Sequence, residues 1–139
     1  MLLIDDDELI SGALYRELVD RGCEVFLATE PGAAESLLRE RDYALVLVDA
    51  YLTGQLHERA AALLDCVLSL RGSAHVLLVT AYGAGLLEQR LKGVASATLV
   101  NKPVPVWMLV EIVSGFLSIR QQRAKKGSTQ RNAREGDNQ

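Results

Sequence analysis

The chain has 139 residues, 49% of them hydrophobic and 24% charged, which is the composition of one ordinary globular domain. The formal net charge of −3 is unevenly spread: residues 120–139 carry six Lys/Arg and two Asp/Glu, whereas residues 1–119 carry nine and sixteen. This acidic body argues against direct nucleic-acid binding, because a nucleic-acid-binding domain carries its positive charge on a folded face.

Cysteine usage and the N-terminus indicate a reducing compartment. Cys23 and Cys66 are too few for a disulfide framework or a zinc site, and we expect both to be buried free thiols. The N-terminus lacks the basic region of a signal peptide, and no apolar stretch approaches the roughly 20 residues that a membrane span needs. We therefore expect a cytoplasmic protein with no membrane insertion.

Short apolar runs alternate with segments of helical periodicity along the first 120 residues. In chain order, the pattern predicts a strand at 2–4, a helix at 10–21, a strand at 24–28, a helix at 29–42, a strand at 43–49, a helix at 56–70, a strand at 74–80, a helix at 83–93, a strand at 97–100 and a helix at 106–120. Residues 121–139 have low hydrophobicity and no periodicity, so we predict one domain over 1–120 and a disordered, basic tail over 121–139.

This (βα)5 alternation predicts a doubly wound parallel sheet in three α/β/α layers. The runs 43–49 and 74–80 are apolar almost without alternation, as expected of strands covered by helices on both faces. Ligands of such sheets bind beyond the carboxyl ends of the strands. The polar residues that follow the strands are therefore the candidates for chemistry.

Several of these polar residues are acidic, which has an electrostatic consequence. Three or more carboxylates in one cleft repel each other and need a compensating cation, and a hard divalent ion such as Mg²⁺ takes oxygen ligands. Together with a lysine and a threonine hydroxyl, such a set suits phosphoryl transfer onto a carboxylate nucleophile. The residues at the strand ends are Asp5, Asp6, Asp7, Asp49, Thr80, Lys102 and Pro103.

Four motifs at these strand ends resemble those of one family, the receiver domain of two-component response regulators. They are "IDDDE", "LVLVDAYLTG", "LLVTAYG" and "NKP", and the resemblance covers about residues 1–120. It implies a flavodoxin-like fold with strand order 2-1-3-4-5. It also implies a signalling module controlled by phosphorylation rather than an enzyme.

The resemblance assigns a phospho-acceptor and a metal site. Asp49 would be phosphorylated, and Asp5 and Asp6 would organise Mg²⁺ or Mn²⁺, Asp5 largely through water. Asp49 and the backbone carbonyl of Tyr51 would complete the protein ligands. Asp7 lies just past this pair, and we expect it instead to cap the following helix or to be an acidic residue of its first turn.

The remaining pocket positions follow from the same resemblance. Thr80 and Lys102 would bind the phosphoryl oxygens, and Ala81 is small enough to admit the group. Pro103 would set the geometry of the loop after Lys102, commonly through a cis peptide bond in this family.

Three positions depart from the family pattern or bear on access. Leu99 stands where receivers usually have an aromatic side chain that turns inward after phosphorylation, and Tyr82 could replace that readout. Tyr51 and Tyr82 occupy the variable positions that flank the phosphoryl group. Two bulky residues there should hinder an attacking water, so we expect slow autodephosphorylation.

The resemblance implies a histidine kinase or phosphotransfer protein as phosphoryl donor. A downstream protein or a second copy would bind the face formed by helix 83–93, strand 97–100 and helix 106–120. An apolar second stripe on the last helix supports this contact, although a helix with a broad core-facing side would have the same pattern. The stripe consists of Val106, Trp107, Val110 and Leu117.

The sequence is also compatible with two alternative functions. A pseudo-receiver would bind partners without phosphorylation, and a haloacid dehalogenase-like phosphatase would use Asp5-x-Asp7 as its first motif and leave Asp49 unexplained.

The chain has two histidines. We expect His57 to be solvated and His75 to be structural, at the end of the sheet opposite the site.

Overall fold

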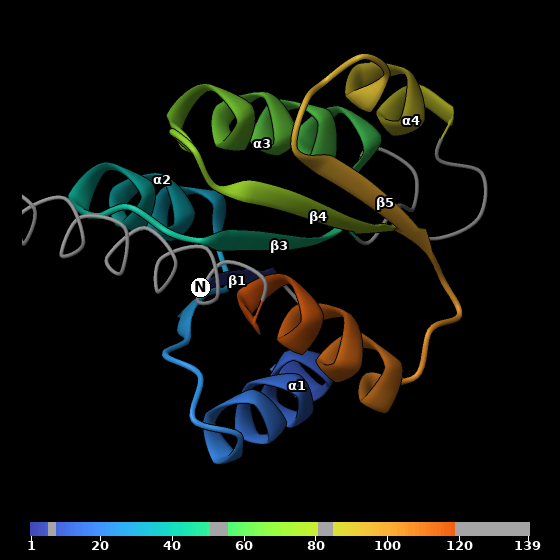
Figure 1. Ribbon diagram of the computed structural model, residues 1–139. Helices are drawn as coiled ribbons and strands as arrows, with labels where there is room; N and C mark the ends of the chain where they lie inside the picture. Colours follow the sequence, from blue (N-terminus) through green and yellow to red (C-terminus); the bar gives the residue numbers. More distant parts are fainter. Residues whose placement is uncertain (6–7, 51–55, 81–84, 119–139) are drawn as a thin grey trace, which may run out of the picture.

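The structure is a computed structural model that describes residues 1–5, 8–50, 56–80 and 85–118, without the side chains of 8–11, 50, 56–59 and 86. Strands and helices alternate along this part of the chain (Figure 1). In chain order they are β1 (Leu2–Asp5), α1 (Glu8–Asp20), β2 (Phe26–Ala28), α2 (Pro31–Glu40), β3 (Leu45–Ala50), α3 (Leu56–Leu70), β4 (His75–Thr80), α4 (Gly85–Leu91) and β5 (Ala97–Asn101). A further helix spans residues 106–118.

The described strands form one parallel sheet with the order β2-β1-β3-β4-β5, which confirms the predicted topology. In this order β1, β3 and β4 are central. The register pairs Asp5 with Asp49 and Ala50 with Thr80, while Thr80 pairs with Asn101 of β5. The carboxyl ends of four strands therefore lie at one edge of the sheet, where the sequence predicted a site.

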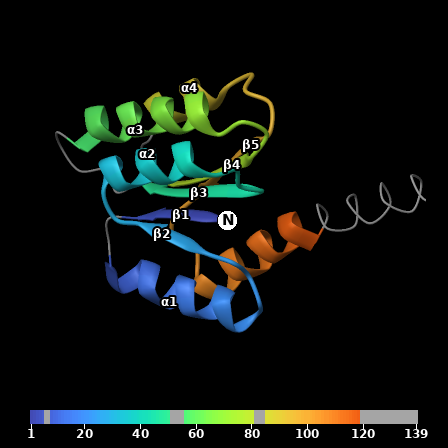
Figure 2. The same ribbon diagram turned by 90° about the vertical axis from the view of Figure 1, so that its left-hand side faces the viewer.

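Helices cover both faces of the sheet, and this gives the predicted three layers. Figure 2 shows α2, α3 and α4 on one side of the sheet, with α1 and helix 106–118 on the other. Successive strand residues enter different cores: Val76 and Leu78 pack beneath α2 to α4, whereas Leu77 and Val79 pack beneath α1 and helix 106–118. Because both faces of β4 are buried, its sequence shows no polar alternation.

Strand and helix ends differ from the predictions by a few residues. The strand predicted over 24–28 is present as β2 from Phe26, because its pairing with β1 begins at Leu2 and Phe26. The strand predicted over 43–49 begins at Leu45 and runs on to Ala50. No helix in the described part of the chain has the length and apolar character that crossing a bilayer requires.

The prediction that both cysteines are buried is wrong. Cys23 and Cys66 are free, as expected, but each is only half-buried. Cys23 lies in the connection between α1 and β2, and Cys66 lies on the side of α3 that faces α2, along a shallow groove that also contains Glu35. Burial and the nearby carboxylate of Glu35 raise the pKa of the Cys66 thiol, so it is less nucleophilic than an exposed cysteine.

The predicted second stripe on the last helix is largely absent. Val110 is buried in the core, and Val106 and Leu117 also pack against that core. Helix 106–118 therefore has a broad core-facing side, which is the alternative explanation given above for its apolar pattern. Trp107 and Met108 remain as its exposed apolar residues, with 65% and 39% of their surface accessible.

The most buried side chains of β4 should dominate stability. Leu78 is fully buried under α2 to α4, so Leu78→Ala is expected to lower the free energy of unfolding by about 3 kcal/mol through lost burial and a cavity. Val19 is 41% exposed on α1, and Val19→Ala should change it by less than about 1 kcal/mol. Urea unfolding of both variants measures this difference, and equal losses would contradict the assigned core.

Candidate functional site

Two buried carboxylates lie side by side at the carboxyl edge of the sheet. Asp5 is the last residue of β1 and Asp49 lies one residue before the end of β3, and they are register partners. Only 3% of Asp5 and 7% of Asp49 is exposed. The apolar residues before them hold each strand between two helical layers, so the strand ends fix the positions of both acids. Acidic side chains this buried need charged or polar partners.

Lys102 provides a charged partner for Asp49. Its Nζ lies 2.6 Å from Oδ1 of Asp49, and 24% of the lysine side chain is exposed, compared with 5% of the aspartate side chain. The Coulombic attraction within an ion pair this short and this shielded from water exceeds that within a surface pair, and it offsets part of the cost of burying both charges. The lysine predicted to act with Asp49 therefore contacts it directly.

The backbone holds Lys102 in place from β4. The amide N–H of Lys102 donates a hydrogen bond of 2.7 Å to the carbonyl of Thr80, the last residue of β4. The Lys102–Pro103 peptide bond is cis, as the resemblance implied. Thr80 is fully buried, so a hydroxyl-bearing side chain and the lysine are fixed at adjacent strand ends.

The donor atoms present fit a hard divalent cation. Asp5 and Asp49 offer carboxylate oxygens from neighbouring strands, which is the chemistry that Mg²⁺ and Mn²⁺ prefer. Among the described residues, no group of three or more His, Cys, Asp or Glu side chains could hold a metal ion. Two other predicted ligands, Asp6 and the Tyr51 carbonyl, lie outside those residues.

Further predicted positions also lie outside the described residues. These are Asp7, Ala81 and Tyr82, so the capping, size and access roles assigned to them stay predictions. The slow autodephosphorylation expected from Tyr51 and Tyr82 likewise stays a prediction.

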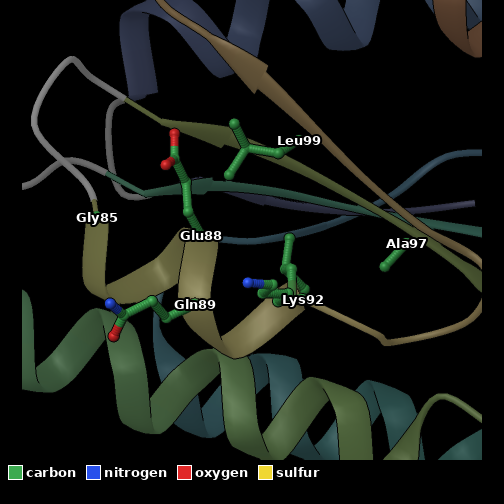
Figure 3. A pocket seen from close by; sticks show the side chains of 7 residues that line it. Gly85, Glu88, Gln89, Lys92, Ala97 and Leu99 are labelled. Atoms are coloured by element: carbon green, nitrogen blue, oxygen red, sulfur yellow. The ribbon is translucent and has the colours of Figure 1, made fainter.

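Leu99 lines a groove between α4 and β5. The groove has a volume of about 600 Å³, and side chains of both elements line it, together with Lys92, which directly follows α4 (Figure 3). Leu99 is partly buried and packs against the core under α2 to α4. We did not predict this groove from the sequence, in which Leu99 was noted only as a departure from the receiver pattern.

Comparison with known proteins identifies the fold. No family model and no curated protein matches the sequence. The receiver domain of NtrX from Brucella abortus has a TM-score of 0.66 and 23% identity, covering 84% of this chain and 97% of that chain. A CheY-like response regulator receiver domain protein from Methanospirillum hungatei has a TM-score of 0.63 and 24% identity, covering 87% and 95%. The chain thus has the flavodoxin-like fold of response-regulator receiver domains.

The same fold occurs under a different description. A structure described as an adenylate cyclase from Rhodopirellula baltica has a TM-score of 0.66 and 15% identity, covering 94% of this chain and 95% of that chain. A fold can host several functions, so the function has to be argued from the residues of the site.

Proposed function

We propose that this protein is a phospho-acceptor receiver module that takes a phosphoryl group onto Asp49. The observation that carries the proposal is the ion pair of Lys102 and Asp49, 2.6 Å long, beside the buried carboxylate of Asp5. The donor in this proposal is a phosphohistidine of a histidine kinase or phosphotransfer protein. The proposed module is a cytoplasmic signalling protein and not a metabolic enzyme.

The proposed step uses a carboxylate oxygen of Asp49 as nucleophile. This oxygen forms a bond to phosphorus while the P–N bond of phosphohistidine breaks, and the leaving nitrogen keeps the electron pair and takes a proton. Lys102 already lies within contact distance of the acceptor, so its ammonium can stabilise the negative charge on the phosphoryl oxygens. The Thr80 hydroxyl would donate a hydrogen bond to the same group.

Mg²⁺ would be held by Asp5, Asp6, Asp49 and the Tyr51 carbonyl, where it would neutralise charge on the carboxylates and the phosphoryl group. The role of this chain is then to align these oxygens at the ends of β1 and β3. For Asp5 and Asp49, this role is supported by the strand register, which pairs the two residues.

Phosphorylation would act on partners by shifting the balance between two conformations. A phosphoryl group contacts Thr80 and Lys102 only in the modified protein, so it can favour whichever conformation improves those contacts. We place the responding face on α4, β5 and helix 106–118, where the groove at Leu99 and the exposed Trp107 lie. A downstream protein or a second copy of the chain would bind there.

Acetyl phosphate tests the proposal without a partner kinase. With Mg²⁺, the protein is expected to gain the mass of one phosphoryl group, and peptide mapping should place it on Asp49. With excess EDTA, the gain should be lost. The acyl phosphate should also be cleaved by hydroxylamine, as phosphate esters of serine or threonine are not.

The same experiment separates the alternatives. Steady release of phosphate without a modified protein would indicate a phosphatase that uses the Asp5-x-Asp7 motif. An unmodified protein at saturating acetyl phosphate and Mg²⁺ would favour a pseudo-receiver. Modification at another residue would overturn the assignment of Asp49.

A further inference from the structure

His75 joins three elements at the end of the sheet opposite the phosphoryl site. It is the first residue of β4, whose last residue is Thr80. Its Nε2 lies 2.8 Å from the Thr98 hydroxyl on β5, and its ring stacks on Phe116 with centroids 4.3 Å apart and planes at 29°. One imidazole therefore contacts both a neighbouring strand and the C-terminal helix.

The surroundings of His75 favour its neutral form. Partial burial and the nearby Arg71 cation lower the pKa of His75 below its ordinary value of 6.5. Arg71 donates hydrogen bonds of 3.0 Å and 2.9 Å to the carbonyls of Ser96 and Ala95, which fixes its charge near the ring. Thr98 and Phe116 do not titrate in this range. Arg71 is therefore the charged side chain that acts on His75 among the described residues.

Helix 106–118 is held differently along its length. Leu109 and Val113 are buried in the core, and Glu111 forms a 3.0 Å ion pair with Arg21 of α1. These contacts hold the first half and do not involve a histidine. The last turns contain Phe116 and Leu117, which are only partly buried against the same core, and Phe116 also stacks on His75.

We propose that His75 is a pH-dependent clamp on the last turns of helix 106–118. In its neutral form the imidazole holds Phe116 against β4 and β5. Protonation places a second cation beside Arg71 in a partly buried site, so residues 114–118 loosen while the first half of the helix stays docked. The clamp acts independently of the phosphorylation proposed above.

The direction of the effect follows from linkage. The pKa of His75 is lowered on folding, so the unfolded or loosened state binds the proton more readily than the docked state. The clamp therefore contributes fully above the ordinary pKa of 6.5, and its contribution is lost as the pH falls through the lowered value.

Amide hydrogen exchange of the full chain tests the clamp. Exchange is compared at about pH 7.5 and about pH 5.5, which span the ordinary pKa of an imidazole, after correction for the intrinsic pH dependence of exchange. We expect a severalfold faster exchange for residues 114–118 at the lower pH and little change for residues 108–113. A uniform change over the whole helix would overturn the proposal.

Three variants complete the test. His75→Phe retains a ring that can stack on Phe116 but cannot be protonated, so the pH effect on 114–118 should disappear. Phe116→Leu removes the stacked ring, and residues 114–118 should then exchange fast at both pH values, whether or not His75→Phe folds. His57→Gln removes the other histidine and should leave the wild-type pH effect unchanged. The proposal fails if His75→Phe or Phe116→Leu keeps the wild-type pH effect.

Discussion

Replacing Asp49 by asparagine is expected to abolish phosphorylation by acetyl phosphate. The substitution keeps the shape of the side chain but removes the carboxylate nucleophile, and an amide nitrogen cannot form the acyl phosphate. Lys102 also loses the anion that lies 2.6 Å from its Nζ. Intact mass measured over time in acetyl phosphate and Mg²⁺ should therefore show no gain.

Asp42 offers a matched control for this variant. It is an exposed aspartate in the connection between α2 and β3, so it precedes the amino end of β3, whereas Asp49 lies near the carboxyl end of that strand. Asp42→Asn makes the same chemical change and should be phosphorylated like the wild type. Asp49→Asn should remain folded. The substitution removes the ion pair with Lys102, but it also removes the repulsion between the carboxylates of Asp49 and Asp5, and the second effect offsets the first. If Asp49→Asn is folded and still gains a phosphoryl group, the proposed acceptor is wrong.

The sequence predicted the sheet well because burial on two faces leaves a strong pattern. The run from Leu45 to Val48 is wholly apolar, and in the structure alternate residues of β3 enter the two cores. Parallel strands place their carboxyl ends at one edge, and the strand order that the receiver resemblance implied brings Asp5, Asp49 and Thr80 to the ends of neighbouring strands. The ion pair of Lys102 with Asp49 agrees with the predicted site, whereas the chemical roles of both residues stay predictions.

Tertiary contacts set the features that the sequence could not predict. Val110 belongs to an apolar stripe that suggested an exposed surface, and only packing against α1 and the sheet shows that it is buried. No local sequence pattern revealed the contacts of His75, because Thr98 and Phe116 are 23 and 41 positions away in the sequence. The groove at Leu99 depends on the distance between α4 and β5, which no local pattern encodes.

Replacing Lys102 by methionine is expected to lower the rate of phosphorylation by about 100-fold or more, the usual loss when a positioned charge that stabilises a transition state is removed. Methionine keeps the length of the apolar stem and removes the ammonium that contacts Asp49. Arg16→Met is the control, because it removes an exposed cation from α1 and should leave the rate unchanged. Intact mass in acetyl phosphate and Mg²⁺ measures all three proteins, and a Lys102→Met rate within about threefold of wild type would contradict this role, since a threefold change is well under 1 kcal/mol.

The same variant should also lose stability, and the pattern of that loss distinguishes electrostatics from packing. Asp5 and Asp49 would lie side by side without the Lys102 ammonium, which is expected to cost about 3 kcal/mol at neutral pH. Acid that protonates one carboxyl, or Mg²⁺ that binds between the two, should restore part of this stability. Thermal unfolding at about pH 7 and about pH 5, with and without Mg²⁺, measures both effects. A loss that neither Mg²⁺ nor lower pH reduces would mean that Lys102 contributes through packing, and the charge balance proposed for the site would then be wrong.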